Sequence, residues 1–238
     1  MLQVLAILFL ATSINSTFGF GLGLIAMPLL SFLVDIKTAT PLVALVAGTT
    51  SLLIFAKNRR EAKLGDAGPM IIASVLGIPF GLYLLKGVAD DLMKSILAIM
   101  IILFASISLS GGFKFTLNSN RLSPLFGFIS GVIASAYNMG GPPIIIYGSL
   151  RKWPPSNFRA TLQSFFLPVC IFTVASHTIG GLVTSEVLHF FLYSLPIILF
   201  TTLVGGKINQ FFSIDRFNRY IYCILLLIGV FLLIKTVS

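Results

Sequence analysis

Two stretches rich in glycine, proline and asparagine interrupt otherwise apolar sequence, and their residue types are those that could bind a ligand. The first reads NSTFGFGLGLIAMP (15–28) and the second reads SAYNMGGPPIIIYGS (135–149). Such residues end one helix and let another begin. A helix that begins inside a protein presents free backbone N–H groups and a partial positive charge. Two of these helix starts facing each other would bind a small anion.

The side chains beside both breaks are mostly neutral hydrogen-bonding groups. We predict a substrate site formed by Asn15, Ser16, Gly19, Gly21, Met27, Thr49, Asn138, Gly140, Gly141, Arg159 and Gln163. Arg159 would add a full positive charge with bidentate geometry for an oxyanion, although snorkelling to the membrane interface is an alternative role. The glycines of the first break could instead serve close helix packing, and the second break could be a simple kink.

The prolines predict where the returning helices begin. Pro28 and Pro143 suit the first turn of a helix, where the missing N–H would have no partner anyway. The residue before a proline is pushed out of the α region, so we expect Met27 and Gly141 to be extended.

The composition is that of an all-α, polytopic integral membrane protein. Hydrophobic residues make up 57% of the 238 residues, charged residues make up 10%, and the mean hydropathy is +1.03. Apolar spans of about 18 residues, the length that crosses a hydrocarbon core of ~30 Å, cover roughly 39–56, 67–85, 92–110, 160–176, 187–206 and 220–237. The connections between them are too short for a soluble domain.

The chain contains an internal duplication. LIAMPLLSFLVDIK (24–37) matches MGGPPIIIYGSLRK (139–152), and DLMKSILAIMIIL (91–103) matches DRFNRYIYCILLL (215–227). We therefore predict one transmembrane repeat over 1–112 and a second over 121–238, within a single membrane domain. Such repeats are common in secondary transporters, whose substrate site lies at the repeat interface.

The lysines and arginines favour one topology. Each repeat opens with a segment that contains one of the breaks. If each opening segment crossed the membrane once, the sixteen lysines and arginines would divide seven against nine between the two sides. If each opening segment is a re-entrant hairpin, they divide twelve against four, and the four are Lys37, Lys86, Lys94 and Lys235. The second division obeys the positive-inside rule. It predicts two inverted repeats in the cell (inner) membrane, each a broken hairpin plus three transmembrane helices, with both termini external.

Several classes of function are disfavoured. The acidic residues all lie in or beside loops, which argues against a carboxylate proton relay or a cation site: Asp35, Glu61, Asp66, Asp90, Asp91, Glu186 and Asp215. Cys170 and Cys223 have no metal-ligand spacing and are interpreted as core residues, and His177 is interpreted as an interfacial residue near the outer end of its span. We expect no metal, no cofactor and no enzymatic activity. The charge of +9 is attributed to cytoplasmic loops and not to nucleic-acid binding.

Three motifs together resemble the sulfite exporter TauE/SafE family of membrane transporters. They are the glycine-rich break followed by MPLL, the restart at NMGGPPIIIYG, and FRATL (158–162). The resemblance covers nearly the whole chain and implies export of small sulfur oxyanions such as sulfite, or of organosulfonates such as sulfoacetate, across a bacterial-type plasma membrane. The first break reads GFGLG where the family has adjacent glycines, and Asn138 and Met139 stand where a further glycine-rich turn is common. The motifs therefore indicate the family more sharply than the substrate.

The function expected from the residues and the resemblance is transport of a small anion, with the lipid bilayer as the other partner. Transport of a different anion such as a carboxylate, or a non-transporting scaffold role, are the alternatives. The sequence leaves open whether two copies associate as a homodimer.

Overall fold

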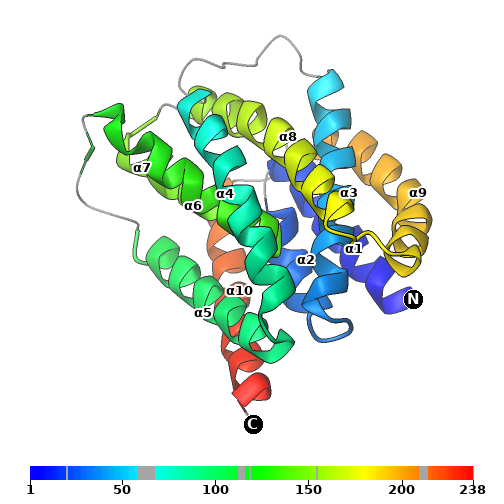
Figure 1. The fold of residues 1–238 in the computed structure, drawn as a ribbon. Helices are drawn as coiled ribbons and strands as arrows, with labels where there is room; N and C mark the ends of the chain where they lie inside the picture. The colour runs from blue at the N-terminus through cyan, green and yellow to red at the C-terminus, as the bar shows by residue number, and fades with distance from the viewer. Residues whose placement is uncertain are drawn as a thin grey trace.

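The computed structural model describes residues 1–19, 21–57, 68–111, 116–117, 119–153, 155–208 and 214–237, and over these ranges all regular structure is helical. The first half contains two short helices and three longer ones: α1 (Leu2–Phe18), α2 (Leu22–Leu30), α3 (Ile36–Lys57), α4 (Gly68–Gly87) and α5 (Asp90–Leu109). After the 3-10 turn η2 (Asn120–Leu122) the order recurs: α6 (Ser123–Tyr137), α7 (Gly141–Leu150), α8 (Pro155–Ile179), α9 (Ser185–Ile208) and α10 (Ile214–Val237). The two halves intermingle in one helical body (Figure 1).

The long helices have the length and apolar character of membrane spans. Within the described residues, five stretches qualify: Ile36–Ile54, Gly68–Gly87, Asp90–Leu109, Ser185–Gly205 and Arg219–Thr236. The described apolar part of α8, Ser164–Ile179, is shorter. Large apolar side chains project outward from these helices, as Ile72, Leu76 and Phe80 do on α4 with 60–67% of their surface exposed. An apolar exterior of this kind suits lipid, so the prediction of a polytopic helical membrane protein is confirmed.

The most extensive helix contacts join the two halves. Helix α4 packs along α6, α1 along α9, α5 along α10 and α3 along α8. In chain order, α1 to α5 correspond to α6 to α10. If each helix is replaced by its counterpart, the same four pairs result. The core is therefore built between the halves and not within each of them.

Glycines bring the backbones of α4 and α6 into direct contact. A Cβ atom added to Gly131 would lie 2.0 Å from the Ser74 carbonyl oxygen, and one added to Gly81 would lie 2.2 Å from the Val132 carbonyl oxygen. The Ser74 hydroxyl also donates a hydrogen bond of 2.7 Å to the Gly127 carbonyl oxygen. Small residues allow this approach between membrane helices, where packing replaces the hydrophobic effect as the driving force. We call this contact the glycine seam.

The four lysines that form the smaller group in the twelve-to-four division of charges lie at one end of the helical body. Lys37 Nζ donates to the Lys86 carbonyl oxygen at 3.1 Å, and Lys86 Nζ donates to the Gly180 carbonyl oxygen at 2.9 Å. These bonds tie the start of α3 to the ends of α4 and α8. We call this the lysine end.

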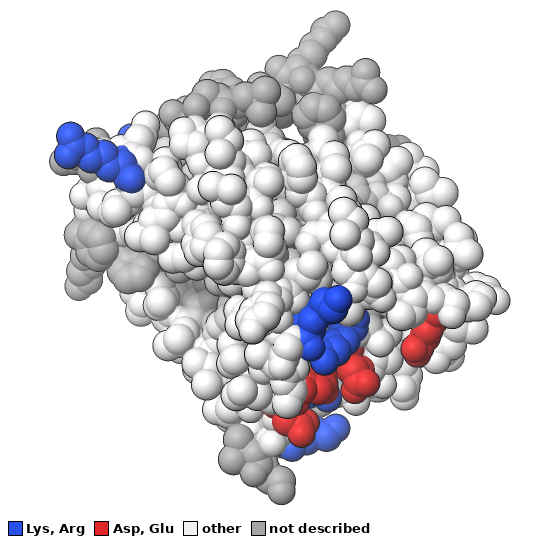
Figure 2. Space-filling view, viewed as in Figure 1, with Lys and Arg blue, Asp and Glu red and all other residues white. Residues whose placement is uncertain are grey.

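The start of α5 and the end of α10 belong to the same end of the molecule. Asp90 accepts a bond of 2.8 Å from the Ile36 backbone N–H and forms an ion pair of 2.6 Å with Lys94. Lys235 Nζ lies 5.2 Å from the centroid of the Phe32 ring, in the turn that precedes α3. Figure 2 shows charged atoms at two opposite edges of the molecule and an uncharged surface between them.

The α6–α7 hairpin opens at the opposite end. The Leu117 N–H donates to the Leu150 carbonyl oxygen at 2.9 Å, and Arg151 donates to the Leu117 carbonyl oxygen at 2.8 Å. The end of α7 thus returns to the chain segment that precedes α6. We call this the arginine end.

Candidate functional site

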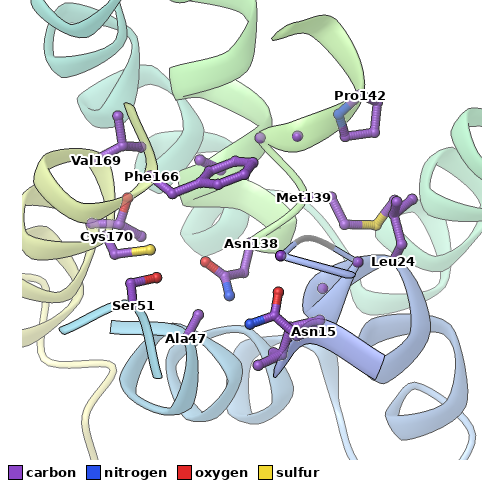
Figure 3. A pocket seen from close by; sticks show the side chains of 18 of the residues that line it. Asn15, Leu24, Ala47, Ser51, Asn138, Met139, Pro142, Phe166, Val169 and Cys170 are labelled. Atoms are coloured by element: carbon purple, nitrogen blue, oxygen red, sulfur yellow. The ribbon is translucent and has the colours of Figure 1, made fainter. Parts of the chain in front are cut away.

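A cavity of about 60 Å³ lies where the breaks of the two hairpins meet. Its wall comes from both breaks and from the middle of α3 and α8: Asn15, Gly19, Gly21, Leu22, Gly23, Leu24, Ala47, Ser51, Ile54, Ala134, Asn138, Met139, Gly140, Gly141, Pro142, Ile145, Phe166, Val169, Cys170 and Thr173. Figure 3 shows the two asparagine side chains near its centre.

Both breaks form through the same backbone conformation. Helix α1 ends at Gly19 with φ 84° and helix α6 ends at Asn138 with φ 50°, both left-handed. Each of these residues donates its N–H at 2.7 Å to a carbonyl four residues earlier, on Asn15 and Ala134. Glycine and asparagine are the residues that adopt this conformation most readily, so the sequence allows the chain to turn at both places.

The prediction that Pro28 opens the returning helix and that Met27 is extended is wrong. Helix α2 starts at Leu22, and both Met27 and Pro28 lie inside it, with Met27 fully buried. Gly21, with φ 101°, supplies the turn that starts the helix, because a glycine accepts this conformation without a Cβ clash.

The expectation of an extended Gly141 is also wrong. Gly141 is the first residue of α7, with Pro142 and Pro143 following it in the first turn. The clash that pushes a residue before proline out of the α region involves its Cβ, which glycine lacks.

The two breaks touch each other directly. A Cβ added to Gly23, in the first turn of α2, would lie 2.0 Å from the carbonyl oxygen of Asn138 and 3.4 Å from Met139 Cγ. Only a residue without a side chain allows this approach. The start of α2 is therefore fixed against the break of the other hairpin.

Both returning helices present their N-terminal turns to the cavity, but with unequal numbers of donors. The first N–H groups of a helix have no intrahelical acceptor, so Leu22, Gly23 and Leu24 offer three donors at the start of α2. In α7, Pro142 and Pro143 carry no N–H, which leaves Gly141 as the donor there. The α2 end therefore offers the cavity more free backbone donors than the α7 end does.

Polar side chains complete the wall. The amides of Asn15 and Asn138 lie on either side of the space between the breaks, and Ser51 lies beside Cys170 (Figure 3). The Ser51 hydroxyl and the Cys170 thiol are joined by a hydrogen bond. Thr173 adds a hydroxyl one turn further along α8. Cys170, interpreted from the sequence as a core residue, is buried but also lines the cavity.

The wall draws on corresponding positions in the two halves. Gly19 and Asn138 are 119 residues apart (138 − 19), and the same interval separates Ala47 from Phe166, Ser51 from Cys170 and Ile54 from Thr173. The cavity therefore lies where the two halves of the chain present equivalent residues to each other.

Six of the eleven predicted site residues line the cavity: Asn15, Gly19, Gly21, Asn138, Gly140 and Gly141. Three others do not. Ser16 packs against Gly205 of α9, Met27 lies in the core, and the Thr49 hydroxyl donates back to the Leu45 carbonyl oxygen at 2.9 Å. Arg159 and Gln163 belong to α8, but their side chains lie outside the described residues.

The site residues predicted from the sequence did not include Ser51 and Thr173, which the structure places in the cavity wall. The interpretation of His177 as an interfacial residue is wrong. His177 is fully buried, and its Nε2–H donates a bond of 2.8 Å to the Ser135 carbonyl oxygen. No motif near His177 indicates this contact, which joins α8 to the hairpin of the second half.

The described wall of the cavity contains no charged side chain. Backbone donors, two amides and two hydroxyls make it a neutral, hydrogen-bonding environment with two positive helix termini. No cluster of histidine, cysteine and acidic residues able to hold a metal occurs among the described residues. An environment of this kind has the chemical character that suits a small anion.

The comparisons with known proteins agree with the family suggested by the motifs. The family model described as sulfite exporter TauE/SafE matches residues 4–232. A protein of Cupriavidus necator named probable sulfite/organosulfonate exporter TauE is similar, with 26% identity over 250 aligned positions that cover 100% of this chain and 95% of that protein. No solved structure matches the chain. The family match spans almost the whole chain, and the protein therefore belongs to the TauE/SafE family of sulfite exporters, a family of multi-pass membrane transporters.

Proposed function

We propose that the protein exports a small sulfur oxyanion, such as sulfite or an organosulfonate, and that the anion binds in the cavity between the two hairpin breaks. The observation that carries the proposal is the meeting of two helix N-termini and two asparagine amides around one uncharged cavity. An oxyanion spreads its charge over several acceptor oxygens, and clustered backbone donors match this distribution.

The size of the cavity favours a compact anion. A volume of about 60 Å³ holds roughly four water-sized groups at ~15 Å³ each. A sulfur atom with three oxygens is a group of this size. The organic part of a larger sulfonate would require the cavity to open toward one end of the molecule.

The contacts at the two ends support an inverted topology in the cell membrane. The lysine end gathers the four minority lysines, whereas the α6–α7 hairpin opens at the arginine end. Met1 lies beside Ser185 and Glu186 at the start of α9, which follows the end of α8. With the arginine end in the cytoplasm, both termini are external and the two hairpins enter from opposite sides. An inside-negative potential then favours anion exit.

Efflux from proteoliposomes tests the proposal. We expect saturable efflux of labelled sulfite, lost in Gly141→Val, because Gly141 lines the cavity and the Cβ of the added side chain would already lie 3.4 Å from the Phe166 ring. Gly87→Val is the matched control, since nothing lies within 4 Å of a Cβ at that position. Folded protein that releases neither sulfite nor a simple sulfonate would refute the proposal. Efflux of acetate in place of sulfite would identify a carboxylate transporter.

A further inference from the structure

His177 has a position that anion binding alone does not explain. Among the Asp, Glu, Lys, Arg and His side chains of the described residues, it is the one that is fully buried. An ionisable side chain inside a membrane domain is costly to keep there, and in such proteins it commonly belongs to a substrate or proton pathway.

The hydrogen bond of His177 fixes its tautomer. The Ser135 carbonyl oxygen accepts only, so the bond of 2.8 Å requires the proton on Nε2. Nδ1 therefore carries a free lone pair, and it has no hydrogen-bond partner among the described residues. A buried nitrogen of this kind is the atom that can take up a proton.

The position of His177 on α8 links it to the cavity. Thr173 lies four residues before His177, which places it on the same face of α8 one turn nearer the cavity that it lines. The hydroxyls of Thr173 and Ser135 are also buried and have no partner among the described residues. Thr173 in the cavity wall, Ser135 and its hydrogen-bond partner His177 thus each carry a buried polar atom without a partner among the described residues.

The helices packed against α8 supply no counter-charge. They are α3, α4, α6 and α7, none of which contains an aspartate or glutamate. The described titratable groups on them and on α8 are Lys37, Tyr83, Lys86, Tyr137, Tyr147 and Cys170. Lys86 is the cation among them nearest in the fold, since its Nζ bonds Gly180, three residues after His177. A lysine there opposes protonation of the imidazole, so an uncompensated imidazolium is unfavourable.

We propose that His177 binds a proton when an anion occupies the cavity, and that the protein thereby links anion binding to protonation. The Nδ1 lone pair takes a proton from hydronium, which leaves as water, and the ring becomes an imidazolium. The anion in the cavity, whose wall includes Thr173 one turn from His177, supplies the missing negative charge. This inference rests on the proposed function, because it requires an anion in that cavity.

Thermodynamic linkage between anion binding and protonation of His177 determines the direction of the pH dependence. A bound anion favours the charged imidazole, so it raises the pH at which His177 titrates. By reciprocity, protonated His177 raises anion affinity, and a midpoint shift of about one pH unit corresponds to about tenfold tighter binding. Affinity is therefore higher below the His177 midpoint and falls as the pH rises through it.

The histidine content of the chain makes a direct measurement practical. There are two histidines, and the other, His189, is exposed at the start of α9. The single variants His177→Gln and His189→Gln assign the two imidazole resonances of the full-length protein in lipid nanodiscs. We expect added sulfite to move the titration midpoint of His177 upward by about one pH unit, with little change at His189. A His177 midpoint that does not move with sulfite would overturn the proposal.

Transport gives a second readout. Gln can still donate an amide hydrogen to the Ser135 carbonyl but cannot become cationic. If His177 had only a structural role, His177→Gln would therefore retain sulfite transport at every pH. We expect the ratio of apparent sulfite affinity in wild type to that in His177→Gln to fall about tenfold between acid and alkaline pH. Titration of sulfite itself cancels in this ratio. A constant ratio would show a structural role while leaving sulfite export intact, whereas absence of efflux from wild type would contradict the proposed function.

Discussion

Gly23 is the residue at which the two hairpins meet, and its missing side chain is what allows the contact. The atoms opposite it belong to the backbone of Asn138 and cannot rotate away as a side chain would. Gly23 is therefore more sensitive to an added side chain than Gly141, where a Cβ would lie 3.4 Å from the end of the Phe166 ring.

Gly23→Ala is expected to reduce sulfite efflux at least about tenfold, because overpacking at a backbone contact costs about 1–3 kcal/mol and separates the two breaks. Efflux per folded protein in proteoliposomes is the measurement. Gly48→Ala is the control, since the nearest atoms to its Cβ are at 3.8 and 4.0 Å. Equal efflux from both variants would mean that the contact between the breaks is not required.

Asn138 combines a backbone role and a side-chain role that mutation can separate. Asn138→Gly keeps the left-handed turn of φ 50° and removes only the amide. We expect the KM for sulfite to rise about fivefold to tenfold, as expected for a hydrogen bond of about 1 kcal/mol. Asn138→Ala should in addition lower the Tm, since a left-handed alanine costs about 1–2 kcal/mol. An unchanged KM in Asn138→Gly would remove the amide from the site.

At the scale of helices, the glycine seam brings the backbones of α4 and α6 into direct contact. Its glycines are spaced four apart on both helices, at 77 and 81 and at 127 and 131. This small-xxx-small spacing is visible in the sequence and predicts a close helix contact, although it does not say which helix is the partner.

Gly131→Leu should destabilise the folded protein by about 1–3 kcal/mol or more, because its Cβ would overlap the Ser74 carbonyl. Thermal unfolding and gel filtration in detergent measure the loss. Gly87→Leu, on a glycine with nothing within 4 Å of its Cβ, should behave as wild type. If Gly131→Leu were as stable as Gly87→Leu, the seam would not hold the halves together.

Much of the helix order follows from the sequence, and the errors have physical causes. The apolar spans and the breaks were predictable because membrane helices need long apolar runs and because glycine and asparagine mark left-handed turns. The start of α2 was misplaced at Pro28, since the turn at Gly21 begins the helix earlier. The role of His177 was missed because it depends on which helix α8 meets, and local sequence carries no record of that contact.

For the whole molecule, the segregation of charges at two ends makes a single topology testable. A reporter fused after Ser238 should be active on the external side, because Lys235 lies with Phe32 at the lysine end. A matched fusion that ends at Gly111, after the last described turn of α5, should report the cytoplasmic side. A cytoplasmic signal from the full-length fusion would contradict the hairpin topology and with it the inverted arrangement.

The pairing of helices across the two halves determines which parts could move as rigid bodies. The glycine seam joins α4 to α6, and its counterpart joins α9 to α1, so each broken hairpin is attached to a helix from the opposite half. A rocking motion that exposed the cavity to one side and then the other would carry these mixed pairs together. The moving bodies of this protein would therefore each combine helices from both halves, and they would not coincide with the two repeats predicted from the sequence.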